Sequence, residues 1–490
     1  MSKYATPGVY FEPVGTTVSN LIDPLNPTVC AFVGTSQRGK LNTVERVTSW
    51  SNFIEKFAEG LSTPFYSESD LAIAVYGFFQ NGGTECHIAR VGNSKFKKAT
   101  AKDSASTFTA TARDEGAWGN KVTVSVTASA SGSGKDITVK YDGTIVEKYV
   151  NIVDYSVNPK RCYEEVINPN SKYIELSGTL TACELTLAGG ADSTVATADY
   201  KSAFELFDAD TSIRFMAVPA ITDSETVLAL SNYCANRGDV IAVLDPPKAN
   251  VVSATGYADG ATASTALISS ITDKKNPYTI LLTAWGKIKD PNSPIASRTR
   301  YCPPCGHVLG AIVRQIASKG VWISPSGIDA NIIGFLDISV HYTNEQVGKL
   351  NDAGIIPLVQ KPNVGIVLWG ARVLSFTSDD PEFDYLNEVC LNIQVKKALN
   401  EAVQGFIFKP NNEETWNGIK VACEEKLNEF YMAGAFKGET ASSAFYCKCD
   451  KDLNTDSVIN EGKVVAEVGY ATSKPAEFVV IQISHDLQSA

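Results

Sequence analysis

Hydrophobic residues near the start of the chain follow two patterns, short unbroken runs and stripes with helical spacing. Residues 28–34 and 86–91 are apolar runs of the kind found in buried strands. Between them, apolar residues recur at i, i+3, i+4 and i+7, which places them on one face of a helix. The pattern predicts two such helices, at Trp50, Phe53, Ile54 and Phe57 and at Leu71, Ala74, Val75, Phe78 and Phe79.

The same alternation of strand and helix returns after residue 193, and a different pattern interrupts it. Further strands are predicted at 215–219, 240–244 and 278–283. Segments rich in Thr, Val and Ser lie in between, at 107–111, 121–128, 137–141 and 174–187, with Asp142-Gly143 as a hairpin turn. We therefore expect an interrupted α/β domain, residues 28–97 and 193–300, with an inserted β-rich outer domain at 98–192.

The last third of the chain mixes both element types after a turn-rich stretch at 290–304. Helices are predicted at 308–317, 386–403 and 416–433, and strands at 443–449, 464–470 and 478–484. This predicts an α+β C-terminal core domain at 301–474, with an N-terminal extended arm at 1–27 and a C-terminal strand or arm at 475–490. The fold class is thus multidomain, α/β and α+β.

Composition narrows the range of functions. A chain of 490 residues is too long for one ordinary core, and 44% hydrophobic with 20% charged residues is typical of folded proteins. A net charge of -11 with no Lys/Arg run disfavours nucleic-acid binding. Neither a signal pattern at 1–14 nor an apolar run near the roughly 18 residues of a membrane span is present, so we expect a cytoplasmic protein without a membrane segment. The odd number of cysteines, 11, indicates reduced thiols.

One motif resembles a phosphate-binding loop. Residues 34–41, GTSQRGKL, follow a predicted strand and end in Gly39-Lys40. Leu41, however, stands where Ser or Thr would bind magnesium, and residues 42–47 show no helix start whose amides could hold a phosphate. An enzyme that binds a nucleotide phosphate through this loop and Lys40 is therefore the alternative function, from a different class of protein.

Two further patterns resemble metal sites. Asp450, Asp452, Asn454, Asp456 and Glu461 have the spacing of a calcium loop, but Thr455 replaces its glycine and the flanks read as strands, which favours an acidic hairpin turn. Cys302-Pro303-Pro304-Cys305 and His307 would need the distant Cys447 and Cys449 to complete a zinc site, so a rigid proline loop is favoured. No catalytic signature surrounds His87, His341 or His485. We expect no enzyme activity, no cofactor and no metal.

Short phrases along the chain resemble the sheath proteins of contractile tails, found in tailed bacteriophages and phage-tail-like particles. They occur in that family's order and span nearly the whole chain. They lie at 4–10 (YATPGVY), 32–39, 75–82, 114–120 (DEGAWGN), 303–308, 320–322, 350–355 (LNDAGI), 368–372 (LWGAR), 405–412 (GFIFKPNN), 415–416, 434–435 and 475–478 (PAEF).

The resemblance implies a structural subunit that polymerises as stacked sixfold rings around an inner tube and contracts to drive the tube through a cell envelope. Its implied partners are further copies of itself, the inner tail tube protein, and baseplate and tail terminator proteins. It would assemble in the host cytoplasm and end in a virion tail or a released particle. A headless bacteriocin-like particle or an injection system would use such a subunit in the same way.

The family's terminal arms are shared between neighbouring subunits. Prolines isolate a β-capable stretch at 14–22, and residues 478–484 form an apolar strand after Pro475; each would join a sheet edge of another subunit. In the alternative reading, the C-terminal strand completes its own domain. The predicted inter-subunit residues are Val18, Leu21, Ile22, Phe478, Val479, Val480, Ile481 and Ile483. Lys420 and Lys426 are the candidates for facing the tube.

Overall fold

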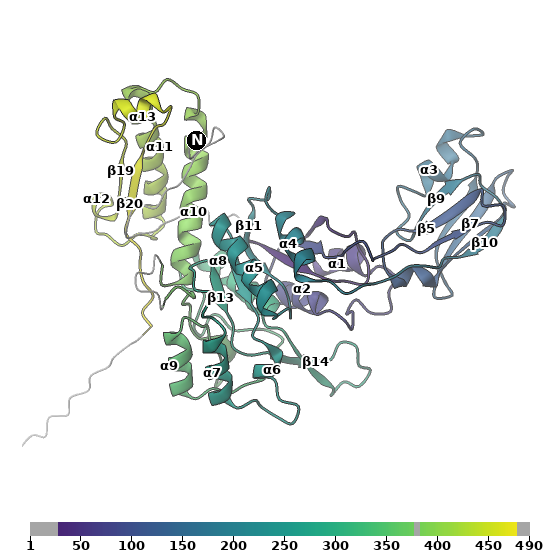
Figure 1. Ribbon diagram of the computed structural model, residues 1–490, viewed down its shortest axis with the longest axis horizontal. Helices are drawn as coiled ribbons and strands as arrows, with labels where there is room; N and C mark the ends of the chain where they lie inside the picture. The colour runs from purple at the N-terminus through teal and green to yellow at the C-terminus, as the bar shows by residue number, and fades with distance from the viewer. Residues whose placement is uncertain (1–27, 377–382, 478–490) are drawn as a thin grey trace, which may run out of the picture.

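The computed structural model describes residues 28–376 and 383–477, and Figure 1 shows three parts, with the C-terminal part at the upper left and the β-rich part at the right. A β-rich lobe (residues 98–192) lies at one end and a C-terminal lobe (residues 404–470) at the other. The central unit (residues 28–97 and 193–376) lies between them, and a long helix leads from it into the C-terminal lobe. The molecule is a mixed α/β protein with several separate sheets, in agreement with the coarse fold class that we predicted.

The central unit is built on a six-stranded sheet in the order β13-β12-β11-β1-β3-β2. Neighbouring strands are parallel except for β2, which pairs antiparallel with β3 at the edge. Their bounds are β1 Val29–Gly34, β2 Val44–Val47, β3 Cys86–Arg90, β11 Ile213–Ala217, β12 Ile241–Leu244 and β13 Thr279–Leu281. Parallel strands are buried on both faces and read as continuous apolar runs, which is why the sequence located all of them but β2.

Helices surround this sheet. They are α1 Trp50–Phe57, α2 Leu71–Gln80, α4 Thr197–Glu205, α5 Ser224–Arg237, α6 Lys248–Val251, α7 Gly260–Ser269, α8 Cys305–Lys319 and α9 Asn344–Asp352. The stripes predicted for α1 and α2 are confirmed, since Phe53, Phe57 and Phe78 are buried. Helix α2 lies directly along α8, and Gly306 permits the close approach, because a Cβ there would lie 2.0 Å from the backbone oxygen of Ala74.

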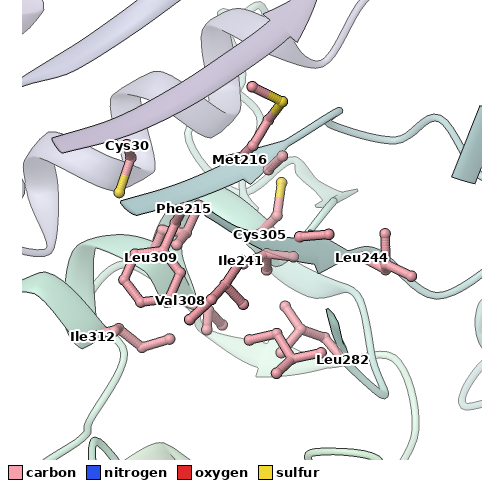
Figure 2. Packing of buried hydrophobic residues seen from close by; sticks show 14 of the residues in the cluster. Cys30, Phe215, Met216, Ile241, Leu244, Leu282, Cys305, Val308, Leu309 and Ile312 are labelled. Atoms are coloured by element: carbon pink, nitrogen blue, oxygen red, sulfur yellow. The ribbon is translucent and has the colours of Figure 1, made fainter. Parts of the chain in front are cut away.

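The core of the central unit continues beyond residue 300. Figure 2 shows Val308, Leu309 and Ile312 of α8 packed against side chains of the central sheet, among them Phe215 and Ile241. The same hydrophobic cluster includes Val373 and Leu374. The cluster thus continues across residue 301, where we predict a domain boundary: α8 packs with the sheet, and the cores change within the helix that follows residue 385.

Two smaller sheets extend the central unit. One has the order β15-β14-β16, with β14 Gly286–Lys289, β15 Thr299–Cys302 and β16 Asp337–Ile338. The other is the hairpin of β17 Leu358–Lys361 and β18 Gly365–Leu368.

The β-rich lobe encloses its own hydrophobic cluster between two sheets, ordered β4-β5-β9 and β10-β6-β7-β8. Its elements are β4 Thr100–Lys102, β5 Phe108–Ala112, η1 Ala117–Lys121, β6 Val122–Ala128, β7 Lys135–Tyr141, β8 Thr144–Ile152, η2 Pro159–Arg161, α3 Tyr163–Val166, β9 Ile174–Gly178 and β10 Cys183–Thr186. The predicted hairpin turn is confirmed, because Asp142 and Gly143 have φ of 49° and 81° and connect β7 to β8. The segment predicted as one stretch, 174–187, is two strands in different sheets.

The C-terminal lobe packs a long helix against a hairpin. Its elements are η3 Gln404–Phe406, α11 Glu413–Met432, α12 Ala441–Ala444, β19 Phe445–Lys448, α13 Asp456–Asn460 and β20 Glu467–Tyr470. Helix α10 (Leu386–Val403) joins the lobe to the central unit. It packs Val389 and Ile393 into the central cluster and Val395 and Leu399 into the cluster of the lobe, so it takes part in both cores.

Candidate assembly site

The predicted inter-subunit residues lie outside the described part of the chain. This holds for Val18, Leu21 and Ile22 and for Phe478, Val479, Val480, Ile481 and Ile483. Their role stays a prediction. The residues that lead into the C-terminal strand, in contrast, are described up to Glu477.

These leading residues, 471–477, form a strap that returns from the C-terminal lobe to the central unit. Figure 1 shows the chain descending beside α10 after β20. Side-chain contacts follow its course toward the start of that helix. They are Tyr470 Oη to Asn392 Oδ1 at 3.0 Å, Thr472 Oγ1 to Glu388 Oε1 at 3.4 Å, the ion pair of Lys474 with Asp384, and the ion pair of Glu477 with Arg372.

Arg372 holds the end of the strap. Its Nε lies 3.1 Å from both carboxylate oxygens of Glu477, and Nη2 lies 2.5 Å from Oε2. Nη1 donates to the Asn351 carbonyl at 3.1 Å and to Asp352 Oδ1 at 3.2 Å. The side chains of Arg372 and Glu477 are only 6% and 14% exposed, so the pair lies largely out of water.

Arg372 with Asn351 and Asp352 forms a binding site for Glu477, here called the Arg372 cradle, and two aromatic rings complete it. The guanidinium carbon of Arg372 lies 3.9 Å from the centroid of the Phe376 ring, and Tyr385 Oη donates to Glu477 Oε2 at 3.2 Å. Burial alone lowers the pKa of Arg372, but the hydrogen bonds and charge of Glu477 outweigh it and raise the pKa. The arginine therefore stays charged, and it binds a carboxylate in the two-pronged geometry that its planar group favours.

The two tube-facing candidates lie on α11 and are partly exposed. Lys420 Nζ lies 3.8 Å from Glu424 Oε1 and Lys426 Nζ lies 2.9 Å from Glu429 Oε2, both within the helix. Such exposed pairs contribute about 0.5 kcal/mol or less, so either ammonium group can exchange its partner for a carboxylate on another protein. The structure does not bring these lysines together with the Arg372 cradle.

The loop at 34–41, which resembles a phosphate-binding loop, presents carbonyl oxygens and not amides to its centre. Buried Arg90 donates to the carbonyls of Ser36 at 2.9 Å, Gly39 at 2.6 Å and Glu115 at 3.0 Å. The loop thus directs carbonyl oxygens at a cation, whereas a phosphate needs converging amides. Lys40 points to Glu45, 3.2 Å away, and β2 follows in place of a helix.

Arg38 of the same loop reaches into the β-rich lobe. Its guanidinium carbon lies 4.0 Å from the ring centroid of Trp118 and 4.8 Å from that of Tyr173, and it donates to the carbonyls of Glu59 and Lys172. Asp114 lies 3.7 Å away. Sequence reasoning missed Arg38, Arg90 and Arg372. The available signal was their position inside phrases shared with sheath proteins or at the end of an apolar strand.

Residues 193–374 match the family model of the phage tail sheath protein central domain. These residues are therefore similar to a phage tail sheath domain. The resemblance to contractile tail sheath proteins that the sequence indicated is thereby confirmed. The matched range coincides with the second segment of the central unit, residues 193–376, except for its last two residues. None of the curated proteins compared with the chain matches it.

Solved structures of sheath proteins share the fold over nearly the whole chain. The helical sheath of the anti-feeding prophage (AFP) in its contracted state is 18% identical, with a TM-score of 0.60 and coverage of 99% of this chain and 100% of that one. The contracted sheath complex of the extracellular contractile injection system PVC is also 18% identical, with a TM-score of 0.58 and coverage of 100% and 99%. The sheath tail protein Lin1278 of Listeria innocua is 14% identical, with a TM-score of 0.64 and coverage of 93% and 96%.

Sheath phrases that are distant in sequence meet in the structure. The phrases at 350–355, 368–372 and 475–478 supply Asn351 with Asp352, Arg372 and Glu477, which are the parts of the cradle. Likewise the phrases at 32–39 and 114–120 supply Arg38 and Trp118. The sheath phrases therefore mark places where segments are tied together.

The cysteines of the zinc lookalike lie in different cores. Cys305 belongs to the central cluster, whereas Cys447 and Cys449 belong to that of the C-terminal lobe. Burial raises the pKa of the Cys302 and Cys305 thiols well above the ordinary value, which makes them poor ligands and nucleophiles. Among the described residues, no group of three or more His, Cys, Asp or Glu side chains is arranged to hold a metal ion.

The calcium lookalike is a connection between strands. It lies between β19 and β20, so strands flank it as predicted, but it is longer than the predicted hairpin turn because it includes α13. Asn454 is buried there. Asn454 Oδ1 accepts from the Val465 amide at 2.6 Å, and its Nδ2 donates to the carbonyls of Asp450 and Val465. This side chain closes the loop on itself. In residues 28–376 and 383–477, no helix combines the length and apolar character needed to cross a bilayer.

Proposed function

We propose that this chain is the structural subunit of a contractile tail sheath. It polymerises as stacked sixfold rings around an inner tube and contracts to drive the tube through a target cell envelope. The observation that carries the proposal is the fold shared over 99% and 100% of the two chains with the AFP helical sheath, together with the sheath domain at 193–374. The subunit does mechanical work and catalyses no reaction.

The links between subunits are strands exchanged from the two termini. A strand of five or six residues forms roughly four to six backbone hydrogen bonds of about 1 kcal/mol each, besides burying alternate side chains. The hairpin of β19 and β20 is a suited acceptor, because it has two strands among the described residues and such a sheet gains stability from a third. In the alternative reading, the C-terminal strand completes this sheet in its own subunit.

Contraction needs no nucleotide. Head-to-tail contacts that do not close on themselves generate helical polymers, and flexible links let rigid subunits slide into a denser packing. The work then comes from interface buried in the denser state. The extended state is metastable, assembled on the tube and released when the baseplate triggers the first ring; a tail terminator closes the far end.

The C-terminal lobe faces the tube in this proposal. Lys420 and Lys426 lie on α11, which is flanked by the phrases at 405–412 and 434–435 that resemble sheath proteins. We expect lysine-to-carboxylate cross-links from these residues to the tube protein. If only the β-rich lobe formed cross-links to the tube, the proposal that the C-terminal lobe faces the tube would be wrong.

The particle that carries the sheath is either a phage tail or a headless relative. The second candidate is favoured by the similarity to the sheaths of the anti-feeding prophage and of the extracellular contractile injection system PVC. The subunit would do the same work in both.

Electron microscopy of the purified chain, alone and with its tube protein, tests the proposal. Long hollow cylinders that shorten and widen on triggering are the expected result. A monodisperse monomer at high concentration, with or without the tube, would contradict it.

A further inference from the structure

The end of the described chain is attached to the central unit and not to the lobe from which it comes. Glu477 lies in the Arg372 cradle. Ala371, which precedes Arg372 in the chain, accepts a hydrogen bond at its carbonyl from the Leu386 amide at 2.7 Å. Arg372 thus belongs to the packed junction between the central unit and the start of α10. A segment that continues from Glu477 begins at this junction.

The strap leading to the cradle has little other support. Ala471 donates its amide to the Ala444 carbonyl and accepts from the Lys437 amide, but no residue from 472 to 477 belongs to a hydrophobic cluster of the described chain. Lys474 and Asp384 form an ion pair whose lysine is 60% exposed, which contributes less than about 1 kcal/mol. The Glu477–Arg372 pair is the one that is both buried and held at several atoms, so it carries most of the attachment.

Losing one partner of this pair is costly for the other. Without Glu477, the guanidinium keeps the Asn351 carbonyl and the largely exposed Asp352 carboxylate, but several N–H groups lose their acceptor. Without Arg372, the Tyr385 hydroxyl is the only partner that the Glu477 carboxylate keeps among the described residues, and the carboxylate is driven toward water. Either change releases the end of the strap.

We propose that Arg372 is a positioning residue for assembly. It fixes the root of the C-terminal segment to the central unit of its own subunit, so that the exchanged segment begins at residue 478. Tension on that segment then passes through Glu477 into the central unit, and the C-terminal lobe is not pulled. The inference rests on the proposed function where it assumes that residues 478–484 join a neighbour.

Cleavage by a glutamate-specific protease measures the attachment without any polymer. The protease must bind the Glu477 side chain to cut the Glu477–Phe478 bond. In the full wild-type chain the carboxylate is engaged, and we expect the Arg372→Ala variant to lose residues 478–490 at least about tenfold faster by mass spectrometry. The control is Lys361→Ala, which removes a partly buried cation 3.5 Å from the centroid of the Trp369 ring in the same region. Equal cleavage rates in the wild type and Arg372→Ala would overturn the inference.

Assembly on the tube measures the role of the attachment. Arg372→Ala, the milder Glu477→Gln and the double variant should keep wild-type circular dichroism and assemble at least about tenfold less sheath. The double variant should assemble no less than the worse single variant, because both lose one interaction. Arg372→Lys, which keeps the charge and loses the two-pronged contact, should be intermediate.

The two measurements separate the possible failures. If folded variants with fast cleavage assemble as the wild type does, the positioning role is wrong. If the wild-type chain forms no cylinders while the cleavage result holds, the proposed function is wrong and the attachment remains.

Discussion

Two buried arginines determine what the loop after β1 can do. Arg90 gathers the loop's carbonyl oxygens beneath it, and Arg38 extends from its outer side between Trp118 and Tyr173 of the β-rich lobe. Burial lowers the pKa of both guanidinium groups, and the Asp114 carboxylate acts in the opposite direction. A loop held in this way is a joint between two parts of the molecule, and it offers carbonyl oxygens where a phosphate needs amides.

Replacing Arg38 should weaken that joint. Arg38→Ala removes the stacking on two rings and leaves the carbonyls of Glu59 and Lys172 without a donor, so we expect a loss of about 2–4 kcal/mol in the free energy of unfolding. Urea denaturation followed by tryptophan fluorescence measures it. Lys40→Ala is the matched control in the same loop; its exposed pair with Glu45 contributes less than about 1 kcal/mol.

Lys40→Ala and the wild type also test the nucleotide alternative. Lys40→Ala should assemble as the wild type does, and neither protein should bind a nucleoside triphosphate in a titration. Micromolar binding that depends on Lys40 would sink the structural interpretation of the loop.

Asp245 makes the stability of the central unit depend on pH. Its carboxylate accepts from the amides of Ala220 at 3.0 Å and Cys305 at 2.9 Å at the start of α8, and the residue is 4% exposed. Burial raises the pKa of Asp245 to about 6, with a smaller contribution in the same direction from Asp70. The folded chain therefore binds this proton more tightly than the unfolded chain does. Its contribution to stability is greatest below the unfolded pKa of about 4 and falls as the pH rises through 6.

Asp245→Asn should remove this dependence. Between pH 4 and pH 7 the wild type should lose roughly 2–3 kcal/mol relative to the variant, whatever the variant's absolute stability. Asp259→Asn is the control with the opposite sign, because hydrogen bonds from Thr262 lower the pKa of Asp259 and stabilise the ionised form. Parallel wild-type and Asp245→Asn profiles from unfolding at several pH values would contradict the assignment.

At the scale of elements, the sequence predicted what depends on local pattern. The run at 240–244 and the helix Leu386–Val403 were recognised because burial on both faces or along one helix leaves a local signature. The sequence also predicted helix α8, but it did not predict that α8 packs with the central sheet. Its residues from Cys305 to Val313 are buried nearly all round, so no exposed face distinguishes one neighbouring domain from another.

The contacts that tie elements together were beyond local pattern. In the sequence, Arg372 and Glu477 look like ordinary solvated charges, and they meet only because α10 and the strap run side by side in opposite directions. Nothing in the sequence predicts that Arg38 is buried and Lys40 is exposed. Pairing between segments 105 positions apart is set by the whole fold.

The terminal strands are the elements on which assembly should depend. Removing residues 1–22 or 478–484 should leave folded monomers that form no sheath, because each removal deletes an exchanged strand. Val480→Pro should act in the same direction by removing one amide donor and disturbing the ladder. Circular dichroism reports folding while microscopy counts cylinders. Normal, contracting sheaths from the deletion variants would require the mechanism to be abandoned.

At the scale of the whole molecule, the β-rich lobe is an appendage of the central unit. The chain enters and leaves it side by side, since Lys97 and Ala191 exchange backbone hydrogen bonds of 3.0 and 3.1 Å. The lobe has its own core, and Arg38 ties it to the central unit. Its removal therefore opens neither the central sheet nor the C-terminal lobe.

Deleting the lobe should leave the ability to polymerise. Joining Lys97 to Ala191 through a short glycine linker spans two positions that are already paired, so the closure imposes little strain on the central unit. Arg38 then faces water, where its charge is hydrated, in place of two aromatic rings. If the lobe lies on the outer surface of the sheath, the shortened chain should form cylinders of smaller outer diameter and unchanged axial repeat, measured by electron microscopy. Arg38→Ala in the full chain controls for loosening of the joint alone. A shortened chain that folds, by circular dichroism, and yet forms no cylinder would show that the lobe is part of the assembly interface.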